Sequence, residues 1–176
     1  MTRALHIKGF LAKGFSAKGF SYVELMFSIA ILAMLAAAAT PYLEKTIQRN
    51  KESNLREHLR DIRSAIDAYK VASDQGKIQK NVGDSGYPKS LEELVIGVPN
   101  MTDPQKKKLR FLRNLPADPM FIGSVENLNA NINPEETWGK RSYDSDADNP
   151  REGDDVYDVY SLNEQKGLNG IAYRQW

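Results

Sequence analysis

Three residues near the start of the chain, Gly19, Phe20 and Glu24, are spaced so that one proteolytic cut would place a free α-amine close to a carboxylate. The tripeptide Lys-Gly-Phe occurs three times, five residues apart, and Gly19-Phe20 belongs to the third copy. A cut after Gly19 would give Phe20 a new α-amine and would make Glu24 the fifth residue of the product. The fifth residue counted from either earlier phenylalanine is a glycine, so only the third copy supplies a carboxylate there.

Glu24 stands at the start of an uncharged segment that is long enough to cross a membrane. Residues 25–43 contain no charged side chain, and a helix of this length extends over roughly 28 Å, close to the ~30 Å hydrocarbon core of a bilayer. Residues 1–19 contain four basic residues and no acidic one. This distribution is typical of a membrane-targeting segment whose basic end stays in the cytoplasm.

Three interpretations of this segment compete: a plain signal anchor, a secretory signal peptide cut before Thr40, and a prepilin-type segment. The small residues 37–39 offer the small-x-small pattern that signal peptidase requires. A carboxylate inside a bilayer costs at least ~2.5 kcal/mol unless a partner neutralises it. Glu24 therefore either marks the wet edge of the segment or has a partner within it.

The combination of leader and apolar segment resembles the type IV pilin superfamily: a basic leader ends at Gly19, Phe20 follows, Glu24 is fifth and Pro41 is twenty-second in the product. The resemblance implies that prepilin peptidase cuts between Gly19 and Phe20 and that Phe20 is N-methylated. It implies that the uncleaved segment assembles into the core of a helical filament, where Glu24 could meet the Phe20 ammonium of a neighbouring subunit. Pro41 lacks an N–H, so we expect a kink there, and the family adds local melting on assembly.

Beyond Pro41 the pattern becomes amphipathic and predicts one long helix from about Phe20 to Ser73. Apolar residues recur in steps of four and three, which places them on one stripe, at Leu55, Leu59, Ile62, Ile66 and Tyr69. The remaining faces are expected to hold the charged residues Lys51, Glu52, Arg56, Glu57, Arg60 and Asp61. The stripe needs a partner surface, and a sheet from the C-terminal half is the economical choice.

The second half of the chain predicts short elements joined by loops. Ser90 and Glu93 have the spacing of a capping box for a short helix within 87–95. Residues 137–145 and 154–163 have the aromatic and β-branched content of strands. The expected fold is therefore α+β, with one long N-terminal helix, half membrane-spanning and half amphipathic, packed on a small C-terminal antiparallel sheet.

The order of motifs in this half is similar to that of the major pseudopilin of type II secretion systems. "YP", "LPADP", "WGKRSY", "YDVYSL" and a last tryptophan follow the long helix. Residues 120–137 intervene where that family usually runs directly into the Trp-Gly pair, so the chain is a divergent member or a related minor subunit. The resemblance implies a leader (1–19), a transmembrane and filament-core helix (20–43) and a periplasmic globular domain (44–176).

The function implied is that of a structural subunit in a periplasmic pseudopilus, anchored by one span in the inner membrane. The implied partners are further copies of the chain, other pseudopilins, inner-membrane assembly proteins, prepilin peptidase and the lipid bilayer. Two alternatives stay open: a subunit of a type IV pilus, and a soluble secreted protein whose signal peptide is removed.

Few residues are candidates for other chemistry. The absence of cysteine excludes disulfides and thiolate metal sites. His6 would leave with the leader, so a Ser-His-Asp arrangement would need His58, which we expect on a solvated helix face. We find no phosphate-binding loop or dinucleotide fingerprint and predict a non-enzymatic assembly protein. Residues 20–176 carry 20 basic and 23 acidic side chains, which argues against nucleic acid as a partner.

Calcium is the one cofactor that remains a hypothesis. The related secretion proteins often hold calcium in an Asp-rich loop after the "YSL" strand, but here residues 163–173 contain one acid, Glu164. Upstream, four aspartates stand at positions 1, 3, 5 and 12 of an EF-hand-like count, namely Asp144, Asp146, Asp148 and Asp155. These residues either form a solvated acidic hairpin loop or hold a calcium ion, and any calcium effect would arise from 144–155.

Overall fold

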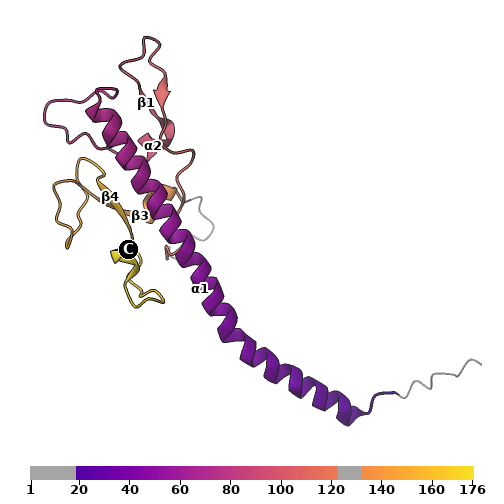
Figure 1. Cartoon of the computed structure of the whole chain (residues 1–176). Helices are drawn as coiled ribbons and strands as arrows, with labels where there is room; N and C mark the ends of the chain where they lie inside the picture. Colours follow the sequence, from indigo (N-terminus) through magenta and orange to yellow (C-terminus); the bar gives the residue numbers. More distant parts are fainter. Residues whose placement is uncertain (1–18, 123–131) are drawn as a thin grey trace, which may run out of the picture. The chain divides into compact units, whose positions relative to one another are not determined.

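The structure is a computed structural model that describes residues 19–122 and 132–176 (Figure 1). The predictions on the first two Lys-Gly-Phe copies, on His6 and on residues 123–131 of the 120–137 insertion lie outside these residues. The helices and strands are α1 (Tyr22–Asp74), α2 (Glu92–Ile96), β1 (Val98–Pro99), β2 (Lys108–Leu109), β3 (Trp138–Arg141) and β4 (Asp158–Ser161), with 3-10 turns η2 (Pro134–Thr137) and η3 (Tyr173–Gln175). A long helix with antiparallel strand pairs confirms the α+β layout.

The chain divides into two compact units, one ending at Leu43 and the other being Glu44–Trp176. Helix α1 runs through this boundary and includes position 41 without a break. It ends at Asp74, where Gly76 adopts a left-handed φ of 71° and the Lys77 N–H donates to the Ala72 carbonyl (3.0 Å). Only glycine takes this backbone conformation without strain. The predicted bounds of the helix are therefore correct within two residues.

The core of the second unit forms on the predicted stripe of α1. The five stripe residues, Leu55, Leu59, Ile62, Ile66 and Tyr69, are at most 6 % exposed. The other buried apolar residues come from the C-terminal part of α1 and from the segments that follow: Ala65, Ala72, Ile78, Leu91, Leu94, Met120, Trp138, Val156, Val159 and Tyr173. All of them lie within Glu44–Trp176, so this unit has a core of its own.

The C-terminal strand pair supplies the middle of that core. Strands β3 and β4 are antiparallel, with Trp138 opposite Ser161 and Lys140 opposite Val159. Trp138, Val159 and Ser161 are buried, as the two-residue side-chain period of a strand allows for one covered face. Both strands are shorter than the predicted 137–145 and 154–163, because the polar segment between them closes through hydrogen bonds of its own.

Two local predictions are wrong or incomplete. Ser90 is not the cap of α2, which begins at Glu92 after Leu91 and has no side-chain cap. The Glu93 carboxylate instead accepts hydrogen bonds from the Lys89 N–H and from the Tyr69 hydroxyl, both at 3.2 Å. The structure also contains a hairpin, β1 with β2, that the sequence did not predict, and the strands form two separate two-stranded sheets.

Candidate functional site

The Gly19–Phe20 peptide bond lies in non-helical chain before the first turn of α1. Both residues are exposed, and the Phe20 side chain retains 78 % of its accessible surface. A Cβ atom added at Gly19 would meet no other atom within 4 Å, and the residue does not have the positive φ that favours glycine. The fold therefore gives no steric or conformational reason for a glycine at this position.

Glu24 lies in the first turn of α1, where a carboxylate interacts favourably with the helix dipole. Its backbone carbonyl accepts a hydrogen bond from the Ser28 hydroxyl (2.8 Å). Within residues 19–122 and 132–176 its carboxylate has no hydrogen-bond or ion-pair partner, and the helix that follows it is mostly apolar. Among the described residues, the carboxylate is thus left without a partner.

The apolar side chains that the structure describes between Leu25 and Leu43 are exposed. Those at least half exposed include Leu25, Met26, Phe27, Ile29, Ile31, Leu32, Met34 and Leu35. By length and composition, this one helix near the N-terminus could cross a membrane. An apolar surface of this extent is not stable in water and needs either lipid or protein to cover it.

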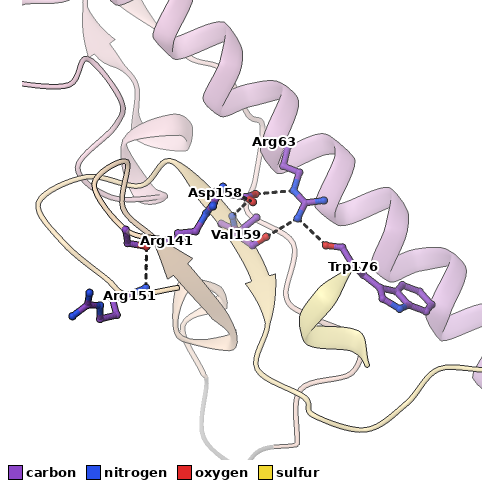
Figure 2. Close-up of polar contacts among 7 residues, drawn as sticks. Arg63, Arg141, Arg151, Asp158, Val159 and Trp176 are labelled. Atoms are coloured by element: carbon purple, nitrogen blue, oxygen red, sulfur yellow. Dashed lines mark hydrogen bonds and ion pairs between the residues drawn. The ribbon is translucent and has the colours of Figure 1, made fainter. Parts of the chain in front are cut away.

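In the second unit, Arg63 joins helix α1 to strand β4 and to the last residue of the chain (Figure 2). Its Nε donates to Asp158 Oδ1 (2.8 Å), and its Nη2 donates to the carbonyl oxygens of Val159 (3.1 Å) and Trp176 (2.8 Å). We call this set the Arg63 clamp. The guanidinium of Arg56, about two turns earlier on the same side of the helix, lies 4.3 Å from the centre of the Trp176 ring. This is a cation–π arrangement.

Glu52 is buried, with 4 % of its surface exposed, although the sequence suggested that it lies on a charged outer face. Its Oε1 accepts hydrogen bonds from the Leu168 N–H (2.7 Å), the Tyr173 hydroxyl (2.9 Å) and Gln48 (3.3 Å). Three donors of this kind compensate for the removal of a carboxylate from water. Glu52 therefore holds the 163–173 loop against α1, which is a structural role that the sequence reasoning missed.

A second buried carboxylate, Asp118, lies in the "LPADP" loop. It accepts hydrogen bonds from the Ser161 hydroxyl (2.5 Å) and the Met120 N–H (2.7 Å). Burial raises the pKa of Asp118, and these hydrogen bonds and nearby His58 oppose that rise. His58 is half-buried and contacts the Ala117 carbonyl through Nδ1 (3.1 Å). Ser161 is fully buried and bonded to the carboxylate, so this arrangement braces β4 and does not present a nucleophile.

The four aspartates proposed as calcium ligands do not converge. Asp144, Asp146 and Asp148 are exposed, whereas Asp155 turns inward. Its Oδ1 accepts from the Ser142 hydroxyl (2.7 Å) and the Tyr143 N–H (2.9 Å), and its Oδ2 accepts from the Ser85 hydroxyl. Among the residues that the structure describes, no group of three or more acidic, histidine or cysteine side chains is placed to hold a metal ion. Hydroxyl and amide donors thus occupy the Asp155 carboxylate, and calcium binding by residues 144–155 stays a prediction.

Asp155 makes the stability of the second unit depend on pH, with a loss of stability in acid. Burial on its own would raise the pKa of this carboxyl, but hydrogen bonds from Ser85, the Tyr143 N–H and Ser142 hold it below the ordinary value. The ionised form therefore stabilises the fold above the pKa of the unfolded chain, near 3.9, and this contribution is lost as the pH falls through the folded-state pKa.

We expect Asp155→Asn to lower the free energy of unfolding of residues 44–176 by about 1–2 kcal/mol at pH 7, because charge-assisted hydrogen bonds are lost. The difference from wild type should shrink as the pH is lowered below 4. Urea unfolding across this pH range measures it. Asp146→Asn, at an exposed aspartate, is the control. A difference that stayed constant down to pH 2.5 would contradict the assigned role.

The Arg63 clamp predicts a loss of stability when the guanidinium is removed. Arg63→Met keeps the length of the side chain but leaves the Val159 and Trp176 carbonyls without this donor. We expect unfolding to become easier by about 1–3 kcal/mol, the lower end reflecting the partial exposure of the group. Arg60→Met, an exposed arginine on the same helix, should stay within about 0.5 kcal/mol of wild type. Equal urea midpoints for the two variants would exclude the clamp as a stabilising feature.

Two features of the described residues thus call for a function: an exposed glycine–phenylalanine bond, and an unpaired carboxylate at the start of an uncovered apolar helix. The second unit is a compact support whose polar contacts hold its last loop and strand on α1. No protein-family model, no curated protein and no solved structure matches this chain.

Proposed function

We propose that this chain is a structural subunit of a periplasmic pseudopilus of a type II secretion system. Prepilin peptidase cuts between Gly19 and Phe20, Phe20 is N-methylated, and residues 20–43 pass from the inner membrane into the core of a helical filament. The globular unit 44–176 then lies in the periplasm. The filament drives protein export together with other pseudopilins and inner-membrane assembly proteins.

The observation that carries the proposal is the position of Gly19. It lies in exposed, non-helical chain, and nothing in the fold requires a glycine there. Gly19 stands one residue before Phe20 and five before Glu24. A glycine that the described fold does not require, at this spacing, supports recognition by a processing enzyme. A peptidase needs accessible backbone outside a helix, and this short segment has it.

The unpaired Glu24 supports the assembly step. In a water-poor filament core a lone carboxylate is costly, and a neighbouring subunit's Phe20 ammonium would neutralise it. Because the cost returns whenever the subunits slip along the axis, the pair would favour one register over others. The exposed apolar side chains around Glu24 supply the contact area, since van der Waals packing replaces lipid as they associate.

A soluble secreted protein is the weaker alternative. Its cleavage would have to occur before Thr40, and there the backbone is part of α1, with the Thr40 hydroxyl bonded to the Ala36 carbonyl (3.1 Å). The helix would have to unwind before a peptidase could reach that bond. A type IV pilus subunit uses the same N-terminal features, and the order of motifs after the long helix is what favours the pseudopilus.

The mature N-terminus of the full chain tests the proposal. The chain is expressed in a bacterium that carries a prepilin peptidase, purified from membranes, and examined by intact-mass and N-terminal peptide mass spectrometry. A product that begins at N-methylated Phe20 supports the proposal. A product that begins at Thr40 supports the secreted alternative, and an uncut chain contradicts both.

A further inference from the structure

Five cations lie in and directly after the β1–β2 hairpin, and the described residues do not neutralise them. All five are exposed: Lys106, Lys107, Lys108, Arg110 and Arg113. We call them the basic hairpin face. No acidic residue lies among positions 104–113. Within the described parts of the chain, none of the five side chains forms an ion pair or a hydrogen bond, so their charge is directed to solvent or to a partner.

One of these cations occupies a backbone position that is better suited to glycine. Lys106 has a φ of 48°, and it is the one non-glycine residue with positive φ among those described. Its N–H donates to the Asp103 carbonyl (2.9 Å) and closes the turn before β2. A side chain in this conformation is strained relative to glycine. The turn thus presents the Lys106 ammonium from a backbone position that glycine would adopt more easily.

The complementary charge is on the same chain, in the loop between β3 and β4. We call residues 144–155 the acidic loop; its exposed acids are Asp144, Asp146, Asp148, Glu152 and Asp154. Arg151 is its single base. Contacts at the base of the loop hold it in place: Ser142 N–H to the Arg151 carbonyl (3.0 Å), and Arg151 N–H to the Ser145 hydroxyl (3.1 Å). The carboxylates are thus presented on a closed loop, and none forms an ion pair with the described residues.

We propose that the basic hairpin face of one subunit docks on the acidic loop of a second copy of this chain. The inference rests on the proposed function, because it names a contact between neighbouring globular units. Two different surfaces meet, so the contact is heterologous, which is the kind of contact from which an open helical filament can be built. Contact between two hairpin faces, or between two acidic loops, is disfavoured by like-charge repulsion.

Charge pairs of this kind set orientation and register more than they add affinity. Exposed charge pairs add little affinity, so the apolar helices would hold the filament together and the charged surfaces would select how globular units meet. The contact should weaken with salt, since the Debye length falls from ~10 Å at 0.1 M to ~3 Å at 1 M.

Directed disulfide cross-linking tests the contact, because the chain has no cysteine of its own. Two full-length chains with different tags are co-expressed, one with Lys107→Cys and the other with Asp146→Cys, and membranes are oxidised. We expect a dimer that carries both tags, several-fold more abundant than the 107–107 or 146–146 dimers. Lys107→Cys with Gln165→Cys, an exposed residue on a different loop, is the control and should give little product.

Charge reversal separates this contact from chance collision. Lys106→Glu, Lys107→Glu and Lys108→Glu together reverse the hairpin, and Asp144→Lys, Asp146→Lys and Asp148→Lys reverse the loop. For these chains the cysteines are moved to Arg113 and Asp154. We expect either reversal alone to reduce the mixed dimer several-fold, and both reversals together in each chain to restore it. Restoration requires that the two surfaces meet each other.

The outcomes distinguish this inference from the proposed function. A mixed dimer no more abundant than the control, or one that survives either reversal, overturns the hairpin–loop contact. If hairpin reversal instead abolishes binding of the chain to vesicles containing anionic phosphatidylglycerol and leaves the dimer unchanged, the face binds lipid and the inference is wrong. Cleavage after Gly19, read by mass spectrometry in the same membranes, reports separately on the proposed function.

Discussion

Gly19→Arg is expected to leave the chain uncut at its full length, with processing reduced to a trace. The reason is local: the bond lies in exposed chain, and among the described residues a Cβ atom added at Gly19 has open space around it. A loss of processing would therefore reflect failed recognition by the peptidase and not misfolding. Intact-mass spectrometry of the membrane-bound protein measures the ratio of uncut to cut chain.

The repeated tripeptide provides matched controls. Gly9→Arg and Gly14→Arg place the same side chain after the first and second Lys-Gly, where no glutamate follows at the fifth position. Both variants should be processed like wild type. If either of them blocks cutting while Gly19→Arg does not, the cleavage site has been assigned to the wrong copy.

Glu24→Ala is expected to leave membrane insertion intact and to reduce filament formation by an order of magnitude or more. Removing a carboxylate from an apolar context makes insertion easier by ~2.5 kcal/mol or more. Assembly loses the partner of the incoming Phe20 ammonium, and an unpaired buried charge costs about 3–5 kcal/mol. Carbonate extraction measures insertion, and filaments sheared from overexpressing cells measure assembly.

Two further substitutions separate charge from position. Glu24→Gln removes the charge with little change of shape and should behave like Glu24→Ala. Glu44→Ala removes an exposed acid just beyond the other end of the apolar segment and should assemble normally. Normal filaments with Glu24→Gln would show that the carboxylate has no role in assembly.

The long helix was predictable because a single physical pattern controls it. Apolar residues at steps of four and three define a buried face whatever the partner is, and all five stripe residues are buried. The same pattern could have found Glu52. The stripe, continued backwards from Leu55 by three and then four residues, reaches Glu52 and Gln48. Residue type had suggested a solvated face, but Tyr173 and the Leu168 N–H supply hydrogen bonds that make burial possible.

The remaining errors involve partners that lie far away in the sequence. Ser90 has the spacing of a capping box, yet Glu93 is drawn to the Tyr69 hydroxyl on α1. Strand β2 begins within a run of lysines that has no alternation, so nothing local indicated it. Asp155 has the spacing of a metal ligand, but its carboxylate accepts a hydrogen bond from the Ser85 hydroxyl, 70 positions earlier. Such contacts depend on tertiary structure and leave no periodic signal.

The contacts of Glu52 have a consequence for the order in which the chain acquires its structure. Its hydrogen bonds to Leu168 and Tyr173 span 116 and 121 positions. The apolar stripe beside Glu52 is covered by strands from the same late part of the chain. At ~5–20 residues per second, synthesis separates these segments by on the order of ten seconds. In the topology proposed above, the apolar stripe of α1 would therefore cross the membrane before the segments that cover it have been made. We expect the chain to need a chaperone that binds the uncovered stripe until the 163–173 loop has been made. Contacts between segments so far apart in sequence form slowly, which lengthens the time that the stripe stays uncovered.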